Sequence, residues 1–189
     1  MTGKKQSAVS TKASVDTIKL TVNGKKYELT IGDDIEPWES LAYDVYPWDM
    51  LLHTLREKLG LTGTKSSCDR GACGACSVLI DGKLALSCMV LTADCDGKEI
   101  TTIEGLSDPV TGKLHPIQEA FIENNAAQCG FCTPGMVIAT KALLDENPDP
   151  TKEDIKRALA GNICRCGNYN LIIKSVLAAA KKVRQESKK

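Results

Sequence analysis

Hydrophobic and polar residues alternate near the start of the chain, which is typical of β-strands that bury one face. Apolar residues occupy every second position of residues 18–22 and again of residues 27–31. Asn23-Gly24 lies between the two segments, and this pair favours a tight hairpin turn because both residues tolerate positive φ angles. The pattern therefore predicts a β-hairpin from residue 17 to residue 31.

The hydrophobic period changes after this hairpin. Leucines recur at a spacing of three or four in residues 48–61, which predicts an amphipathic helix packed across the sheet. Residues 77–88 carry two apolar segments around Asp81-Gly82 and predict a second hairpin, and residues 100–103 predict a last strand. Strands with one crossing helix are typical of a β-grasp domain, which we expect to end near residue 106.

Helix-forming residues dominate from residue 107 onward. Four helices are expected, at residues 115–124, 134–147, 151–160 and 171–186. Thr151 and Asp154 have the spacing of a capping box, and Pro134 suits the first turn of its helix. This part of the chain is therefore expected to form a bundle of four short helices.

Composition narrows the choice of partners and compartment. The chain has 24 basic and 24 acidic residues and no basic stripe, which argues against a nucleic-acid partner. No apolar segment is long enough to span a membrane, and the polar residues 1–15 lack the apolar core of a secretion signal. The nine cysteines are therefore expected to be reduced, metal-binding thiols of a cytoplasmic protein rather than disulfides.

Four of the cysteines have the spacing C-x4-C-x2-C-x11-C, by which plant-type ferredoxins hold a [2Fe-2S] cluster. They are Cys68, Cys73, Cys76 and Cys88. Gly71 and Gly74 allow the loop to adopt the backbone angles that a tight wrap requires. A zinc site or a disulfide framework is the alternative, but zinc sites more often use paired C-x2-C ligands. The spacing predicts an iron–sulfur cluster and a ferredoxin-like domain.

A second set of cysteines has the spacing C-x2-C-x31-C-x-C. It consists of Cys129, Cys132, Cys164 and Cys166. Each pair precedes a predicted helix, whose positive dipole end is expected to lower the pKa of the thiols. From these four residues alone a structural zinc site is a serious rival. Because C-x-C is unusual for zinc and a ferredoxin-type loop lies nearby, we expect a second [2Fe-2S] cluster.

Other residues with chemical potential have simpler interpretations. Cys95 fits neither spacing and is interpreted as a spare structural cysteine, and His53 and His115 as ordinary structural residues. Residues 32–47 form an acidic, aromatic insertion. This insertion is interpreted either as a docking surface or as a surface loop packed on itself, with equal weight.

Four stretches together resemble the small iron–sulfur subunit of the xanthine oxidase family of molybdenum hydroxylases, as in aerobic carbon monoxide dehydrogenase. They are residues 62–65, 71–76, 128–136 and 161–166, and the resemblance extends from about residue 17 to residue 182. It implies an α+β fold, in which a β-grasp, plant-type ferredoxin-like domain at 17–106 precedes a four-helix [2Fe-2S]-binding domain at 107–187. Residues 1–16 are expected to be a disordered tail.

The resemblance also assigns the ligands. It implies that Cys68, Cys73, Cys76 and Cys88 hold the cluster distal to molybdenum, and that Cys129, Cys132, Cys164 and Cys166 hold the proximal one. Gln128 and Cys166 are expected to contact the pterin of the molybdenum cofactor. Without the resemblance, Gln128 would be interpreted as a capping or surface amide. No residue of this chain is expected to be catalytic.

The function that the resemblance implies is electron transfer within a multisubunit oxidoreductase. Single electrons would pass between the molybdopterin centre of a large subunit and FAD in a medium subunit, through the two clusters of this chain. The three subunits would be separate polypeptides, and two such heterotrimers could pair as a dimer. One alternative is the same relay in a reductive dehydroxylase resembling 4-hydroxybenzoyl-CoA reductase, and another is a free ferredoxin-like carrier. Gly167-Asn168-Tyr169 departs from the Thr-Gly-Tyr of many relatives, and the 32–47 insertion is longer than usual. The substrate and the direction of turnover stay open.

Overall fold

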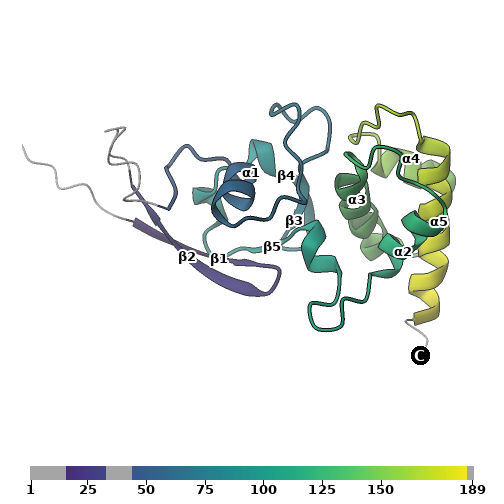
Figure 1. Ribbon diagram of the computed structural model, residues 1–189, viewed down its shortest axis with the longest axis horizontal. Coiled ribbons are helices and arrows are strands. Elements are labelled where there is room, and N and C mark those ends of the chain that lie inside the picture. The colour runs from purple at the N-terminus through teal and green to yellow at the C-terminus, as the bar shows by residue number, and fades with distance from the viewer. Residues whose placement is uncertain (1–15, 33–43, 187–189) are drawn as a thin grey trace, which may run out of the picture.

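The computed structural model describes residues 16–32 and 44–186 (Figure 1). Residues 1–15 of the expected tail and most of the 32–47 insertion lie outside these ranges. Asp16, which was expected in the tail, is the first residue of a strand. In the described part of the chain, a five-stranded sheet occupies one half of the molecule and the longer helices occupy the other.

The predicted N-terminal hairpin is confirmed. Strands β1 (Asp16–Val22) and β2 (Lys25–Ile31) pair in antiparallel fashion, with Val22 opposite Lys25. Asn23 and Gly24 form the turn with φ angles of 52° and 77°. Both angles lie in the left-handed region, where Asn and Gly have the smallest steric penalty. The sequence of the turn thus sets the register, which places the alternating apolar residues of β1 in the core.

The second hairpin is also confirmed, and it completes the sheet. Strands β3 (Ser77–Ile80) and β4 (Lys83–Leu86) pair in antiparallel fashion, and β5 (Glu99–Thr101) lies between β1 and β3. The strand order is β2-β1-β5-β3-β4, with β5 parallel to β1 and antiparallel to β3. The parallel pair β1 and β5 is flanked by β2 on one side and by the β3–β4 hairpin on the other, which is the expected β-grasp arrangement.

Strand β5 is shorter than the predicted segment 100–103. The backbone N–H of Thr102 donates to the side chain of Asn23 at 2.9 Å, and Ile103 begins a 3₁₀-helix, η4 (Ile103–Leu106). Asn23 therefore has two roles, because it forms the first hairpin turn and also caps the end of β5. This side-chain contact spans 79 residues of sequence, so the local pattern could not indicate it.

The predicted helix at 48–61 is wrong in its extent. Only α1 (Leu51–His53) and a continuous π-helix, η1 (Thr54–Lys58), are helical. Asp49 lies outside the helix because it closes a turn, in which its carboxylate accepts from the N–H of Tyr46 at 2.9 Å. The ring of Trp48 also lies outside the helix and stacks on Tyr46, with centroids 5.2 Å apart. The packing prediction is confirmed, since the buried side chains of Leu51 and Leu55 belong to the core of the sheet.

All four predicted helices of the second half are present. They are α2 (Pro116–Glu123), α3 (Thr133–Glu146), α4 (Lys152–Ala158) and α5 (Tyr169–Glu186). The capping box at the start of α4 is confirmed, because Thr151 accepts from the N–H of Asp154 and Asp154 accepts from the N–H of Thr151. His115 has a structural role as predicted, since its Nδ1 accepts from the N–H of Ile117 and caps α2.

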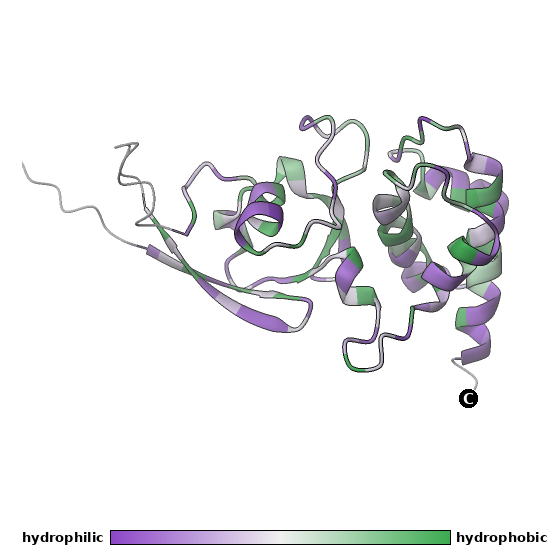
Figure 2. Ribbon diagram, viewed as in Figure 1, coloured by the Kyte–Doolittle hydropathy of each residue, from purple (hydrophilic) through white to green (hydrophobic). Residues whose placement is uncertain are grey.

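Helix α3 lies between the two halves. It packs against β3 and β4 on one side and against α2 and α4 on the other. Figure 2 shows hydrophobic residues along this helix, and Met136 and Ile138 are fully buried. The α3 helix therefore fixes the sheet relative to the helical bundle. In the described residues, no helix has the length and hydrophobicity needed to cross a membrane.

Candidate metal centres

The first group of cysteines, Cys68, Cys73, Cys76 and Cys88, is brought together by the β3–β4 hairpin. Cys76 directly precedes β3, and Cys88 lies in a 3₁₀-helix, η2 (Ser87–Met89), that follows β4. The N–H of Ser87 donates to the carbonyl of Cys76 at 3.2 Å and closes the hairpin. As predicted, the hairpin returns Cys88 to the cysteine loop.

Within this group the thiols meet in two pairs. Cys68 lies close enough to Cys73, and Cys76 close enough to Cys88, for one thiol of each pair to shift the pKa of the other. A [2Fe-2S] cluster shares four thiolates between two irons, so it needs thiols in this paired arrangement. In the described ranges, no three His, Cys, Asp or Glu side chains have the geometry of a site for a single metal ion. The paired thiols fit a two-iron cluster.

The loop between Cys68 and Cys76 wraps tightly, as the glycines predicted. Gly71 and Gly74 have φ angles of 72° and 70°. The N–H of Ala72 points at the sulfur of Cys68, 3.3 Å away. Such a hydrogen bond stabilises negative charge on the sulfur, which is the form that binds iron. The loop thus supplies both the thiols and a backbone donor for their charge.

The thiols of this group differ in burial and, as a result, in pKa. Backbone N–H groups of Arg70 and Ala72 lower the pKa of Cys68 to about 7. Burial raises the pKa of Cys76 to about 11, because the charged form loses its hydration and lies beside Cys88. Cys76 is 3% exposed and Cys88 is 5% exposed. A metal cation would offset the cost of charge at the buried end of the loop.

The second group, Cys129, Cys132, Cys164 and Cys166, is assembled from two turns of the helical half. Cys129 and Cys132 lie just before α3, where Gly130 has a φ angle of 80°. Cys164 and Cys166 lie just before α5. Cys129 lies close enough to Cys166, and Cys132 close enough to Cys164, for one thiol of each pair to shift the pKa of the other. The structure therefore joins the two turns across the gap in sequence, again as two pairs of thiols.

The electrostatics of this group differ in part from the prediction. The N–H of Phe131 and the thiol of Cys166 lower the pKa of Cys129. Burial acts to raise the pKa of Cys164. Several hydrogen bonds act in the opposite direction, the strongest of them from the N–H of Asn168, and the pKa of Cys164 is lowered overall. For Cys132 the expected lowering is wrong, because burial and the neighbouring Cys164 raise its pKa to about 12. Desolvation outweighs the helix dipole at this position.

The two groups of cysteines meet at a contact that the sequence did not indicate. The N–H of Ile163 donates to the carbonyl of Cys73 at 2.9 Å. Ile163 directly precedes Cys164 of the second group, and Cys73 belongs to the first group. One main-chain hydrogen bond therefore links the segments that carry the two groups. No motif marks a backbone hydrogen bond between residues so far apart in the chain, which is why sequence reasoning missed it.

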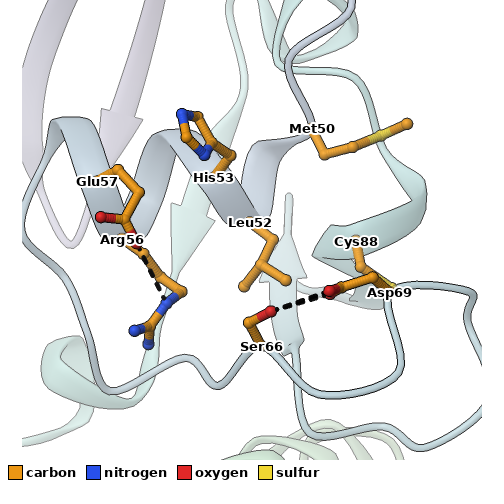
Figure 3. A pocket seen from close by; sticks show the side chains of 8 residues that line it. All are labelled: Met50, Leu52, His53, Arg56, Glu57, Ser66, Asp69 and Cys88. Carbon is orange, nitrogen blue, oxygen red and sulfur yellow. Dashed lines mark hydrogen bonds and ion pairs between the residues drawn. The ribbon is translucent and has the colours of Figure 1, made fainter.

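A cavity of about 280 Å³ lies beside the first group (Figure 3). Its lining comes from the α1–η1 helix on one side and the cysteine loop on the other. The lining residues are Met50, Leu52, His53, Arg56, Glu57, Ser66, Asp69 and Cys88. Asp69 accepts a hydrogen bond from Ser66 at 3.0 Å, and Arg56 lies 3.8 Å from the carboxylate of Glu57.

Arg56 also supports the segment that enters the cysteine loop. Its Nη1 donates to the carbonyl oxygens of Thr62 and Thr64, at 2.9 and 2.8 Å. The π-helical backbone carries Arg56 at this point, and π-helical segments are often found at functional sites. Sequence reasoning missed this role because the acceptors are main-chain atoms.

Two of the remaining candidate residues, Cys95 and Gln128, lie outside the two groups of paired thiols. Cys95 is buried in the core of the sheet, as expected of a structural cysteine, and its thiol donates to the carbonyl of Leu91. Gln128 is exposed directly before Cys129, and Cys166, which is also exposed, lies close to Cys129. Contact of Gln128 and Cys166 with a pterin stays a prediction.

Two family models match the chain in overlapping regions. The model described as "2Fe-2S iron-sulfur cluster binding domain" matches residues 47–121, and the model described as "[2Fe-2S] binding domain" matches residues 102–177. These regions contain the first and the second group of cysteines, respectively. The two matches agree with the paired thiols of both groups.

Similar proteins include iron–sulfur subunits of molybdenum hydroxylases. The nicotinate dehydrogenase small FeS subunit of Eubacterium barkeri is 45% identical over 81% of this chain and 87% of its own length. The xanthine dehydrogenase iron-sulfur-binding subunit of Escherichia coli O157:H7 is 41% identical over 87% of this chain and 94% of its own length. One chain of the crystal structure of quinoline 2-oxidoreductase from Pseudomonas putida 86 has a similar fold, with a TM-score of 0.78 and 38% sequence identity. The match covers 90% of the present chain and 97% of the quinoline 2-oxidoreductase chain. These similarities confirm the predicted α+β fold, and the chain belongs to the small iron–sulfur subunits of the xanthine oxidase family of molybdenum hydroxylases.

Proposed function

We propose that this chain relays single electrons between a molybdenum–pterin centre, held by a large subunit, and FAD in a medium subunit. Its relatives are named as subunits of dehydrogenases, which favours oxidation of a substrate over the reductive alternative. The substrate reaction would take place in the large subunit. The role of this chain would be to hold two clusters at a fixed separation and to contact both partners.

The proposed ligands are the two groups of paired thiols. Cys68, Cys73, Cys76 and Cys88 would hold the distal cluster, and Cys129, Cys132, Cys164 and Cys166 the proximal one. The clusters, when bound, supply one-electron transfer. The chain contributes thiolates, the N–H of Ala72 toward Cys68, and an apolar surrounding that limits water around Cys76 and Cys88.

The observation that carries the proposal is the hydrogen bond between Ile163 and Cys73. It connects the two groups of thiols through main-chain atoms alone, at 2.9 Å. A free carrier with one partner at a time has no need for two thiol groups joined in this way. The joined groups support a relay that accepts electrons at one face and delivers them at another.

The two proposed partner faces are chemically suited to protein contact. Around the second group, the thiols of Cys129 and Cys166 are exposed among the large apolar side chains of Phe131, Ile163 and Tyr169. Apolar and aromatic side chains of this kind are enriched at the cores of interfaces. We assign this face to the large subunit.

A second apolar face lies beside the first group. Met50 is exposed and lines the cavity that reaches Cys88. Met89, which lies against Gly71 of the cysteine loop, and Trp48 are also exposed. We assign this face to the medium subunit. The two faces belong to different halves of the molecule, which suits a relay between two partners.

Purification with the partner subunits tests the relay. The complex, isolated without air, should contain iron, molybdenum and FAD in one fraction, and its reduced form should give two distinct [2Fe-2S] signals in electron paramagnetic resonance (EPR) spectra. A chain that elutes alone with iron would instead support the free carrier. Zinc in place of iron would exclude both the relay and the carrier.

Gln128→Ala tests the proposed contact with the pterin. Gln128 is exposed one residue before Cys129, so its loss should leave both clusters assembled while altering the molybdenum EPR signal of the complex. Gln185→Ala is the matched control, because Gln185 is also exposed but lies near the end of α5. An unchanged molybdenum signal in Gln128→Ala would remove the proposed role.

A further inference from the structure

Three residues from distant segments meet where the cysteine loops adjoin. Gly74 lies in the loop of the first group, Gly135 in the first turn of α3, and Asn162 just ahead of Cys164. The side-chain amide of Asn162 donates to the carbonyl of Gly74 at 3.0 Å, and Asn162 is only 5% exposed. We call this set of residues, Gly74, Gly135 and Asn162, the spacer contact.

The spacer contact has no room for another carbon atom. A Cβ at Gly135 would lie well under 3.0 Å from the carbonyl oxygen of Gly74, and it would also crowd the backbone of Ala75. A Cβ at Gly74 would lie 2.5 Å from the amide of Asn162 and 2.5 Å from the carbonyl oxygen of Gly161. The obstructing atoms are largely main-chain atoms, which cannot rotate away.

Local structure does not explain the glycine at position 135. Gly135 is helical and has no positive φ angle, so alanine would fit its backbone. Alanine is also the better helix former. The reason for glycine must therefore be tertiary, namely the close approach of the carbonyl of Gly74.

Each member of the spacer contact is close in sequence to a proposed ligand. Gly74 follows Cys73 directly, Gly135 is three residues after Cys132, and Asn162 is two residues before Cys164. The hydrogen bond from Ile163 to Cys73 runs alongside. Any separation of the backbones at the spacer contact would therefore move the two groups of thiols apart.

We propose that the spacer contact sets the distance between the two clusters. The inference rests on the proposed function for the identity of the ligands. It adds residues that hold no iron themselves but position the two groups of ligands. Substituting them should change the distance between the clusters while leaving each cluster intact.

Gly135→Ala tests this proposal, with Gly161→Ala as its control. Gly161 lies next to Asn162 and has no positive φ angle, and no atom lies within 4 Å of the place that its Cβ would take, so a methyl group fits there. Both variants add one methyl group to the full-length chain. The readout is the EPR spectrum with both clusters reduced, because the magnetic splitting between two paramagnetic centres falls with the cube of their distance.

In Gly135→Ala we expect a smaller magnetic splitting, while both cluster signals keep their full intensities. We also expect a lower melting temperature, although alanine is the better helix former. Gly161→Ala should match the wild type in both measurements. A wild-type splitting in Gly135→Ala would overturn the proposal.

Asn162→Ala provides a second test that does not add bulk. It removes the hydrogen bond to Gly74 and should also reduce the splitting. If Gly135→Ala does not fold, Asn162→Ala decides, and an unchanged splitting there would overturn the proposal. If the wild type lacks one of the two cluster signals, the ligand assignment fails instead. In that case the melting temperature alone tests the close approach of Gly135 to Gly74. Equal melting temperatures of Gly135→Ala and Gly161→Ala would contradict this close approach.

Discussion

Cys73→Ser should remove the distal cluster and stop electrons from leaving the chain. The thiol of Cys73 lies beside that of Cys68, and its carbonyl accepts from the N–H of Ile163, so Cys73 belongs to the first group and also to the link with the second. A serine hydroxyl stays protonated near neutral pH and replaces thiolate poorly at iron. The rate of electron delivery to FAD should fall by more than about 10-fold. Mutating a residue that only supports a metal ligand typically costs at least about 10-fold in activity, and Cys73 is a proposed ligand itself.

The measurement is EPR of the complex after mixing with substrate. In Cys73→Ser one of the two iron–sulfur signals should be absent, and substrate should still reduce the remaining one. Cys95→Ala is the matched control, because Cys95 is a buried thiol of the same half that lies in the core of the sheet. It should retain both signals and full electron delivery. Two intact signals in Cys73→Ser would contradict the assignment of this ligand.

Cys164→Ser should have an even larger effect, because it removes the proximal cluster and isolates the distal one from substrate. Cys164 is buried at 7% exposure, and its N–H donates to the hydroxyl of Tyr169 at 2.8 Å. The cluster that Cys164 is proposed to hold would join the turns before α3 and α5, so its loss should also lower the stability of the helical half. Binding of a metal centre contributes directly to the free energy of folding when the ligands come from separate segments.

Two reductants separate the outcomes for Cys164→Ser. Substrate should reduce neither iron–sulfur centre, whereas dithionite should still reduce the distal one and give its normal signal. The second result would show that the distal cluster is intact. Reduction of the distal cluster by substrate at the normal rate would mean that the order of the two clusters is reversed.

Burial has a further consequence for how the centres assemble. Cys76 and Cys132 have raised pKa values of about 11 and about 12, whereas the pKa values of Cys68 and Cys129 are lowered. Each group thus has a thiol that ionises readily toward the surface and another that ionises only with difficulty. A bound metal centre would favour ionisation of the buried thiols, because its positive charge offsets their loss of hydration.

The sequence by itself determined the features that depend on neighbouring residues. Asn23-Gly24 dictates the hairpin turn because both residues accept positive φ angles, and Thr151 caps α4 through the N–H only three positions away. The spacing of the cysteines indicated two clusters, since a short loop limits which metal centre its thiols can wrap. These determinants act over a few residues and leave a direct pattern in the chain.

Only the tertiary structure decided the features that join distant segments. The helix predicted at 48–61 is shorter because Asp49 closes a turn onto Tyr46, and β5 ends early because Asn23 binds Thr102. The pairing of Cys129 with Cys166 depends on how the turn before α3 packs beside the turn before α5.

The same holds for the relay itself. The hydrogen bond from Ile163 to Cys73 and the close approach of Gly135 to Gly74 depend on how α3 packs against the sheet. Backbone atoms make these contacts, and nearly every residue has the same backbone N–H and C=O, so no side-chain pattern could reveal them. The sequence thus determined which metal centres the chain is built to hold, and the packing of its two halves decided how those centres are joined.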